Sequence, residues 1–181
     1  MKLLARLLAV MTLVFSLGLA IGCASGPAVL DLRSFFGEPS RWLLQERFFL
    51  AMVILSNNLR VLFLIAVSGL VVAGPALLIF INGVVIGSVL VQASARLSPS
   101  LLALSILPHG VVEVPAFIYS SAASTAFGLE LWRRIIKKEG DLGRAAESYL
   151  KGLLVSALLI AVAAFIEAHV TLQLVEASLP P

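Results

Sequence analysis

His109 and Glu113 are the two side chains of this sequence with the clearest potential for a chemical role. They lie four positions apart in an apolar stretch, so a helix would place both on one face. Ionisable groups at membrane depth are costly, and they usually face the interior of a helix bundle at a functional site or pathway. An imidazole and a carboxylate at this spacing could relay protons or bind a metal ion.

A structural role explains the same two residues equally well. Pro108 lacks a backbone donor, so we expect one helix to be kinked or broken at Pro108-Gly110, with Pro115 as a second disturbance. His109 or Glu113 could then pair with the backbone groups that the break leaves free. Metal binding is the less favoured functional interpretation, because HxxxE is not the HExxH of zinc proteases and no second histidine lies nearby. We expect no metal and no other cofactor.

Other polar residues also occur within apolar surroundings. Asn82 falls in the third apolar stretch, and Glu167 and His169 fall in the last. Asn82 and Glu167 could converge with His109 and Glu113 on one polar centre. A metal-dependent enzyme would need a third ligand besides His109 and Glu113, and Glu167 or His169 would have to supply it.

These residues are expected to lie on membrane helices. The chain has 181 residues, of which 60% are hydrophobic and 13% charged, whereas a soluble domain is about half apolar and a quarter charged. Such a composition would expose large apolar patches in water, so the lipid bilayer is the expected surrounding. The net charge is +3, and the basic residues cluster at segment ends, which indicates orientation signals and not a nucleic-acid surface.

The fold class that follows is all-α, a single polytopic transmembrane domain with about five spans. About 20 apolar residues are needed for each crossing. Gly74 and Pro75 separate the second span from the third, because proline is well tolerated in the first turn of a helix. The first span could also be a signal peptide, but its apolar run begins without a separate charged region, which favours a retained helix. The expected spans are residues 3–22, 50–73, 75–95, 101–129 and 152–175.

Charge placement predicts the orientation of these spans in the cell membrane. Short loops rich in Lys and Arg stay in the cytoplasm, so the polar 130–151 loop is expected to be cytoplasmic. Counting back across the spans places the amino terminus in the cytoplasm, in agreement with Lys2 and Arg6, and the carboxyl terminus outside. The 24–46 connection is then external, where Trp42 suits a short interfacial helix.

Small residues at four-residue spacing predict where helices pack closely. Gly83 and Gly87 form one such pair, and Ser120, Ser124 and Gly128 continue the pattern on a later helix. Packing within the bundle is the favoured interpretation, and self-association into a homo-oligomer is the alternative. Because the sequence has no nucleophile elbow and no phosphate-binding glycine loop, we expect no enzyme activity.

Several of these segments together resemble the stage II sporulation protein M family, over roughly residues 50–172. The segments are Asn57-Asn58, Gly69, Gly74, Asn82-Gly83, Gly87, residues 107–116, residues 163–167 and Thr171. The family comprises small multi-pass membrane proteins, and its namesake holds peptidoglycan-degrading partners at the septal membrane during engulfment without being thought a hydrolase. The resemblance implies a membrane scaffold, although this chain offers only a short external connection for partners.

Three functions stay open from the sequence. The leading hypothesis is a scaffold or anchor that organises other membrane proteins, with Asn82, His109, Glu113 and Glu167 as a polar centre. The second is a small transporter or a proton or ion conductor, because transporters build sites from helices broken near the midplane. The third is an intramembrane metal-dependent enzyme.

Overall fold

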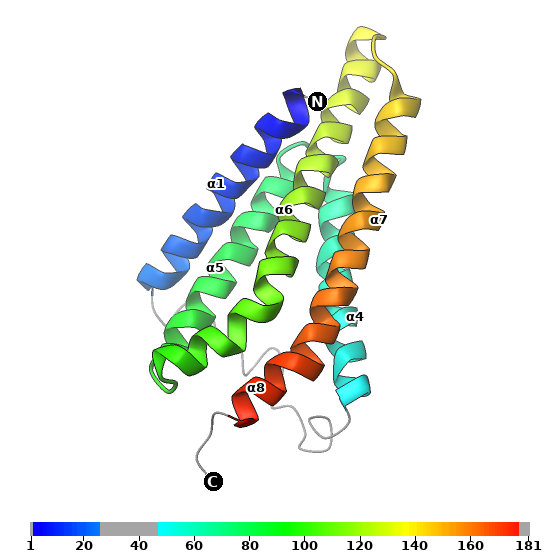
Figure 1. Cartoon of the computed structure of the whole chain (residues 1–181). Helices are drawn as coiled ribbons and strands as arrows, with labels where there is room; N and C mark the ends of the chain where they lie inside the picture. Colours follow the sequence, from blue (N-terminus) through cyan, green and yellow to red (C-terminus); the bar gives the residue numbers. More distant parts are fainter. Residues whose placement is uncertain (1, 26–46, 178–181) are drawn as a thin grey trace.

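The computed structural model describes residues 2–25 and 47–177, and every element among them is helical (Figure 1). Five helical stretches of the described residues are long and apolar enough to cross a membrane, so the chain is an all-α membrane protein. The predicted interfacial helix at Trp42 lies outside the described residues, as do the last four residues of the chain. The elements are α1 (Lys2–Ser25), α4 (Arg47–Ser68), α5 (Gly74–Ser94), α6 (Pro99–Lys137), α7 (Leu142–Ile166), a π-helical turn η2 (Glu167–Thr171) and α8 (Leu172–Ala177).

Local sequence explains where several helices begin. Helix α5 starts at Gly74 with Pro75 in its first turn, where the missing amide proton leaves no helical bond unmade. Helix α6 starts at Pro99, and the hydroxyl oxygen of Ser98 accepts a hydrogen bond from the Leu101 amide at 3.4 Å. Serine at this position satisfies one of the free donors of the first turn.

Helix α6 continues through the residues that were expected to interrupt it. Pro108 and Pro115 both lie inside the single α-helix Pro99–Lys137, and the first part of that helix runs at an angle to the rest (Figure 1). The segment Pro108-Gly110 is therefore not a break but part of one continuous helix. The physical reason is that no water at membrane depth can replace lost backbone hydrogen bonds, so the chain keeps all those that proline allows.

The polar segment 130–151, which was expected to be a loop, is mostly helical. Helix α6 runs on to Lys137, and α7 begins at Leu142, so only four residues form the turn. The turn uses left-handed backbone at Lys138 and at Gly140, whose φ is 99°, and the Asp141 carboxylate accepts a hydrogen bond from the Arg144 amide to start α7. Charged residues four or fewer positions apart support the exposed helix ends, including the Glu147–Lys151 pair.

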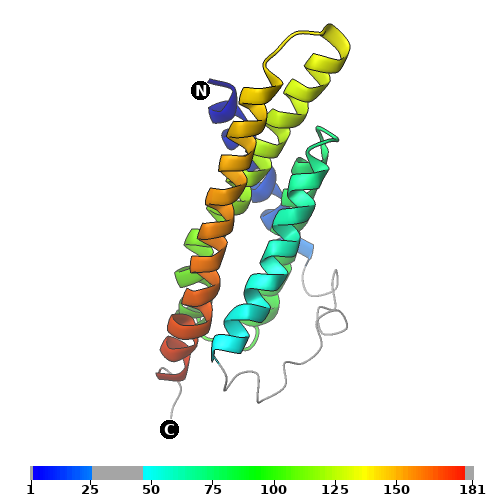
Figure 2. The same ribbon diagram turned by 90° about the vertical axis from the view of Figure 1, so that its right-hand side faces the viewer.

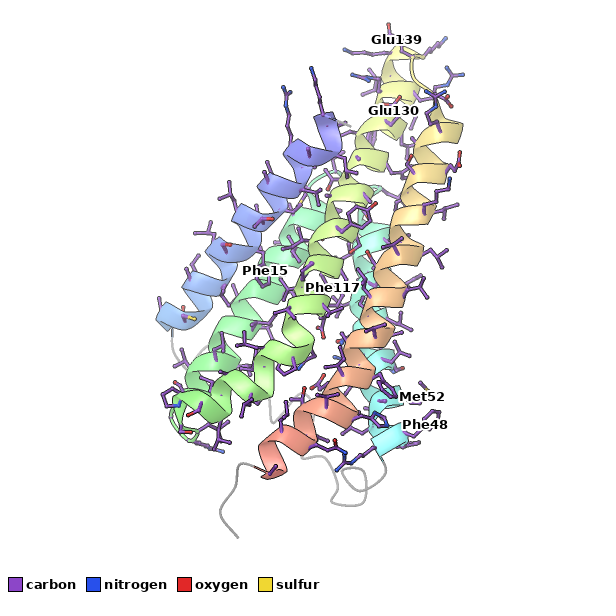
Figure 3. The ribbon with its side chains drawn as sticks, in the orientation of Figure 1. Phe15, Phe48, Met52, Phe117, Glu130 and Glu139 are labelled. Atoms are coloured by element: carbon purple, nitrogen blue, oxygen red, sulfur yellow. The ribbon has the colours of Figure 1, made fainter. Side chains whose placement is uncertain are left out.

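The helices of the described residues form one bundle (Figures 1 and 2). Helix α1 packs on α5 and α6, whereas α4 packs on α5, α6 and α7. The amino-terminal end of α1 and the 138–141 turn lie toward one end of the bundle, and α8 lies toward the other (Figure 1). Phe15 and Phe117 point into the interior (Figure 3), where Phe117 is 1% exposed. The bundle therefore has an apolar core into which a few polar groups project.

Candidate functional site

A hydrogen bond between α4 and α6 lies at the centre of the candidate site. The side-chain amide nitrogen of Asn58 donates to Oε2 of Glu113 at 2.9 Å. Asn58 belongs to the inner face of α4, because the buried residues of this helix are Ala51, Asn58, Leu62 and Ile65, which recur at helical spacing. An amide donor on one helix thus meets the predicted carboxylate on another.

Two of the other predicted residues lie near Glu113. His109 is one turn earlier on the same helix, and His109 and Glu167 both lie close enough to Glu113 to interact with it electrostatically. Glu167 comes from the start of the π-helical turn η2. Asn82 is different: it is half-buried on α5, and its side chain forms no hydrogen bond with any described residue. The structure therefore brings His109, Glu113 and Glu167 together, with Asn58 in the place expected for Asn82.

One buried nitrogen of the His109 ring, Nδ1, has no hydrogen-bond partner among the described residues. A buried polar atom without a partner is unfavourable in apolar surroundings. The Nδ1 atom of His109 is therefore the one buried polar atom of this site for which the described residues supply no partner.

A metal centre has less support from the geometry. No group of three or more His, Cys, Asp or Glu side chains within the described residues is placed to hold a metal ion. His169, a candidate third ligand, instead stacks on the Phe165 ring with centroids 4.2 Å apart. Its Nδ1 lies 3.2 Å from the Phe165 carbonyl oxygen. The metal-dependent alternative thus lacks a three-ligand set in the part of the chain that the structure describes.

The wide turn that carries Glu167 is tied to the start of α4. The Arg47 guanidinium lies 3.5 Å from the His169 carbonyl oxygen, which belongs to the π-helical turn. Such turns are rare, and they occur often at functional sites. The apolar pattern of the last span contains no signal for this turn, so only the tertiary structure reveals it.

Gly83 and Gly87 of α5 pack against a matching pair on α1. A Cβ atom added at Gly83 would overlap the Phe15 carbonyl oxygen, and one at Gly87 would overlap that of Leu19. Gly18 and Gly22 of α1 are equally close to the backbone of α5. The same four-residue spacing of small residues, present in α1, is the signal by which Gly18 and Gly22 could have been found.

The small residues of α6 divide between two roles. Ser124 and Gly128 pack against Gly69 in the turn after α4. The Ser120 hydroxyl is buried and donates to the Phe117 carbonyl oxygen at 3.0 Å within its own helix. Ser124 and Gly128 thus let the 69–73 turn approach the α6 backbone closely.

Two aromatic side chains donate hydrogen bonds to carbonyl groups at the end of α4 and in the turn after it. Nε1 of Trp132 donates to the Leu70 carbonyl oxygen at 3.0 Å, and the Tyr149 hydroxyl donates to that of Ala66 at 3.0 Å. The first bond connects the turn after α4 to α6, and the second connects the end of α4 to α7.

Comparisons with known proteins identify the family of the chain. The family model described as stage II sporulation protein M matches residues 8–172. An uncharacterized protein of Methanocaldococcus jannaschii is 34% identical over 123 residues, which are 65% of this chain and 68% of that protein. No solved structure matches the chain. Because the family model covers almost the whole bundle, this chain is a member of the stage II sporulation protein M family.

Proposed function

We propose that this chain is a membrane scaffold that anchors and organises partner proteins, with Asn58, His109, Glu113 and Glu167 as an internal polar centre. Family membership supports the proposal, because the family's namesake holds partner proteins at a membrane. Acting as a scaffold requires no chemical step, so we propose no enzyme activity for the polar centre.

The Asn58–Glu113 hydrogen bond is the observation that carries this proposal. It uses polar groups at membrane depth to join α4 to α6, as interhelical hydrogen bonds do in membrane bundles. The outer faces meanwhile carry large apolar side chains such as Phe48 and Phe63, which are 72% and 65% exposed. A bundle fixed from within can offer such faces to other helices.

The test is recovery of the tagged full chain from membranes of its source cells in polymer nanodiscs, followed by mass spectrometry. We expect a defined set of membrane proteins to accompany the wild type and to be lost with Glu113→Leu, which removes the partner of Asn58. Thr12→Val is the matched control, because the exposed Thr12 hydroxyl bonds only within its own helix. If no membrane protein accompanies the wild type above an untagged background, the scaffold proposal is wrong.

Proton or cation conduction is the second candidate, and the unpartnered His109 Nδ1 beside Glu113 favours it. The full chain is reconstituted into liposomes with a pH-sensitive dye or labelled cations. As a scaffold, the wild type is expected to add no flux above empty liposomes. Flux that Glu113→Gln abolishes and Thr12→Val preserves would replace the scaffold with a conductor.

A further inference from the structure

The outward face of α4 carries three polar residues close to the middle of a membrane span. Ser56, Asn57 and Arg60 are all exposed, whereas Asn58 between them is buried. Two positions along a helix turn the side chain by about 200°, so Asn58 and Arg60 point in opposite directions. One side of α4 therefore faces the polar centre, and the other presents a cation outward.

Arg60 is too deep for an ordinary anchoring role at the membrane surface. Helix α4 spans Arg47–Ser68, so at 1.5 Å per residue Arg60 is about 12 Å from its nearer end and about 20 Å from the other. Even lenient insertion scales assign an arginine at the helix centre a cost of about 2.5–3.5 kcal/mol. Intramembrane charges are therefore generally paired, and the natural partner of a guanidinium is a carboxylate.

No such partner occurs inside the bundle. Within residues 2–25 and 47–177 the Arg60 side chain forms no hydrogen bond or ion pair. Glu113 and Glu167, the carboxylates of the apolar spans, belong to the internal cluster. The charge of Arg60 is thus uncompensated by the described part of the chain.

A second copy of this chain is a poor partner for this face. Helix α4 contains no Asp or Glu, so a symmetric contact between two α4 helices would bring two Arg60 side chains together without a carboxylate. Like charges in such an interface are destabilising. Charge complementarity therefore favours a different protein.

We infer that this face of α4 binds a transmembrane helix of a partner protein that carries Asp or Glu near its middle and pairs with Arg60. The inference rests on the proposed scaffold function and names the chemistry of the partner. Ser56 and Asn57 lie within one turn of Arg60 and supply further hydrogen-bonding groups. A shallow hollow along the same face, lined by Ser56, Leu59, Arg60, Phe63 and Leu64, gives the incoming helix apolar surface beside the charge.

Synthetic transmembrane peptides of Leu and Ala with one central Glu, Gln or Leu provide the test. The full chain is reconstituted in phosphatidylcholine vesicles with a donor fluorophore at Glu139→Cys in a Cys23→Ser background, and the peptides carry the acceptor. We expect the Glu peptide to bind the wild type about tenfold more tightly than the Leu peptide, which corresponds to about 1.4 kcal/mol. Arg60→Leu should abolish this preference, and Arg60→Glu should transfer it to a peptide with a central Arg.

Arg96→Leu is the matched control, because Arg96 is an exposed arginine in the turn between α5 and α6 and should leave the preference intact. The Arg60→Leu protein should unfold at the wild-type temperature, since Arg60 forms no hydrogen bond or ion pair with a described residue. Equal binding of the Glu and Leu peptides would overturn the inference. Energy transfer between two labelled copies that depends on Arg60 would replace the partner helix with a second copy.

Two further outcomes would identify a different partner for Arg60. Arg60-dependent binding to phosphatidylglycerol vesicles without any peptide preference would identify a lipid headgroup as the ligand. A peptide preference that appears only after Asp31, Glu38 and Glu46 are neutralised would identify the 26–46 segment as the native partner. In nanodiscs from source cells, an Arg60→Leu protein that keeps every wild-type partner would refute this inference and leave the scaffold proposal standing.

Discussion

The side-chain amide of Asn58 and the carboxylate of Glu113 join α4 to α6 through a 2.9 Å hydrogen bond. Interhelical hydrogen bonds in membrane bundles contribute about 0.6 kcal/mol on average and up to about 1.7 kcal/mol. A double-mutant cycle of Asn58→Ala and Glu113→Ala, measured by unfolding in mixed micelles, should therefore give a coupling free energy in this range. The matched cycle of Asn82→Ala and Glu113→Ala should be additive, because Asn82 forms no such bond. Additivity in the first cycle would show that the bond contributes nothing to stability.

Replacing glycine by alanine should have opposite effects at two positions, because only one of them lies where α1 and α5 approach each other closely. Gly87→Ala should destabilise the bundle by about 1–3 kcal/mol, because its Cβ would overlap the Leu19 carbonyl oxygen and force the helices apart. Gly110→Ala should be neutral or stabilising, since the nearest atom to its Cβ is Cγ2 of Ile106 at 3.8 Å and alanine favours a helix.

Thermal unfolding followed by circular dichroism measures the first effect. The Gly87→Ala protein should unfold at a lower temperature than the wild type. Equal stabilities of the Gly87→Ala and Gly110→Ala proteins would contradict the packing of α1 on α5.

The Tyr149 hydroxyl offers a conservative test of the carbonyl groups at the end of α4. Tyr149→Phe removes its bond to the Ala66 carbonyl oxygen and keeps the ring stacked on Phe127 at 4.7 Å. The free energy of unfolding should fall by about 0.5–1.5 kcal/mol. Tyr119→Phe, which removes a hydroxyl without such a bond to a described residue, should have a smaller effect. A Tyr149→Phe protein as stable as the wild type would show that lipid or water replaces the bond.

The arrangement of the helix ends makes the predicted orientation testable at two cysteines. Figure 1 places the 138–141 turn and the carboxyl-terminal end of α1 toward opposite ends of the bundle. If the basic residues face the cytoplasm, an impermeant thiol reagent should label Cys23 in intact cells. In a Cys23→Ser background, Glu139→Cys should be labelled only after the cells are permeabilised. The reverse pattern would invert the topology.

The class of fold and the approximate positions of the helices follow from local sequence patterns. Long apolar stretches identify spans because the hydrocarbon core excludes polar backbone and side chains. The start of α5 at Gly74-Pro75 is equally local, because it depends on the backbone of proline alone. The four-residue spacing of His109 and Glu113 likewise places them on one helix face without further information.

Which groups on different helices meet follows only from the three-dimensional packing. Asn58, and not Asn82, reaches Glu113 because contact between helices depends on their relative rotation and register, which a local pattern does not contain. The π-helical turn that begins at Glu167 is likewise absent from the sequence pattern and visible only in the structure. The outward position of Arg60 likewise became visible only once the inner face of α4 was fixed by its contact with Glu113.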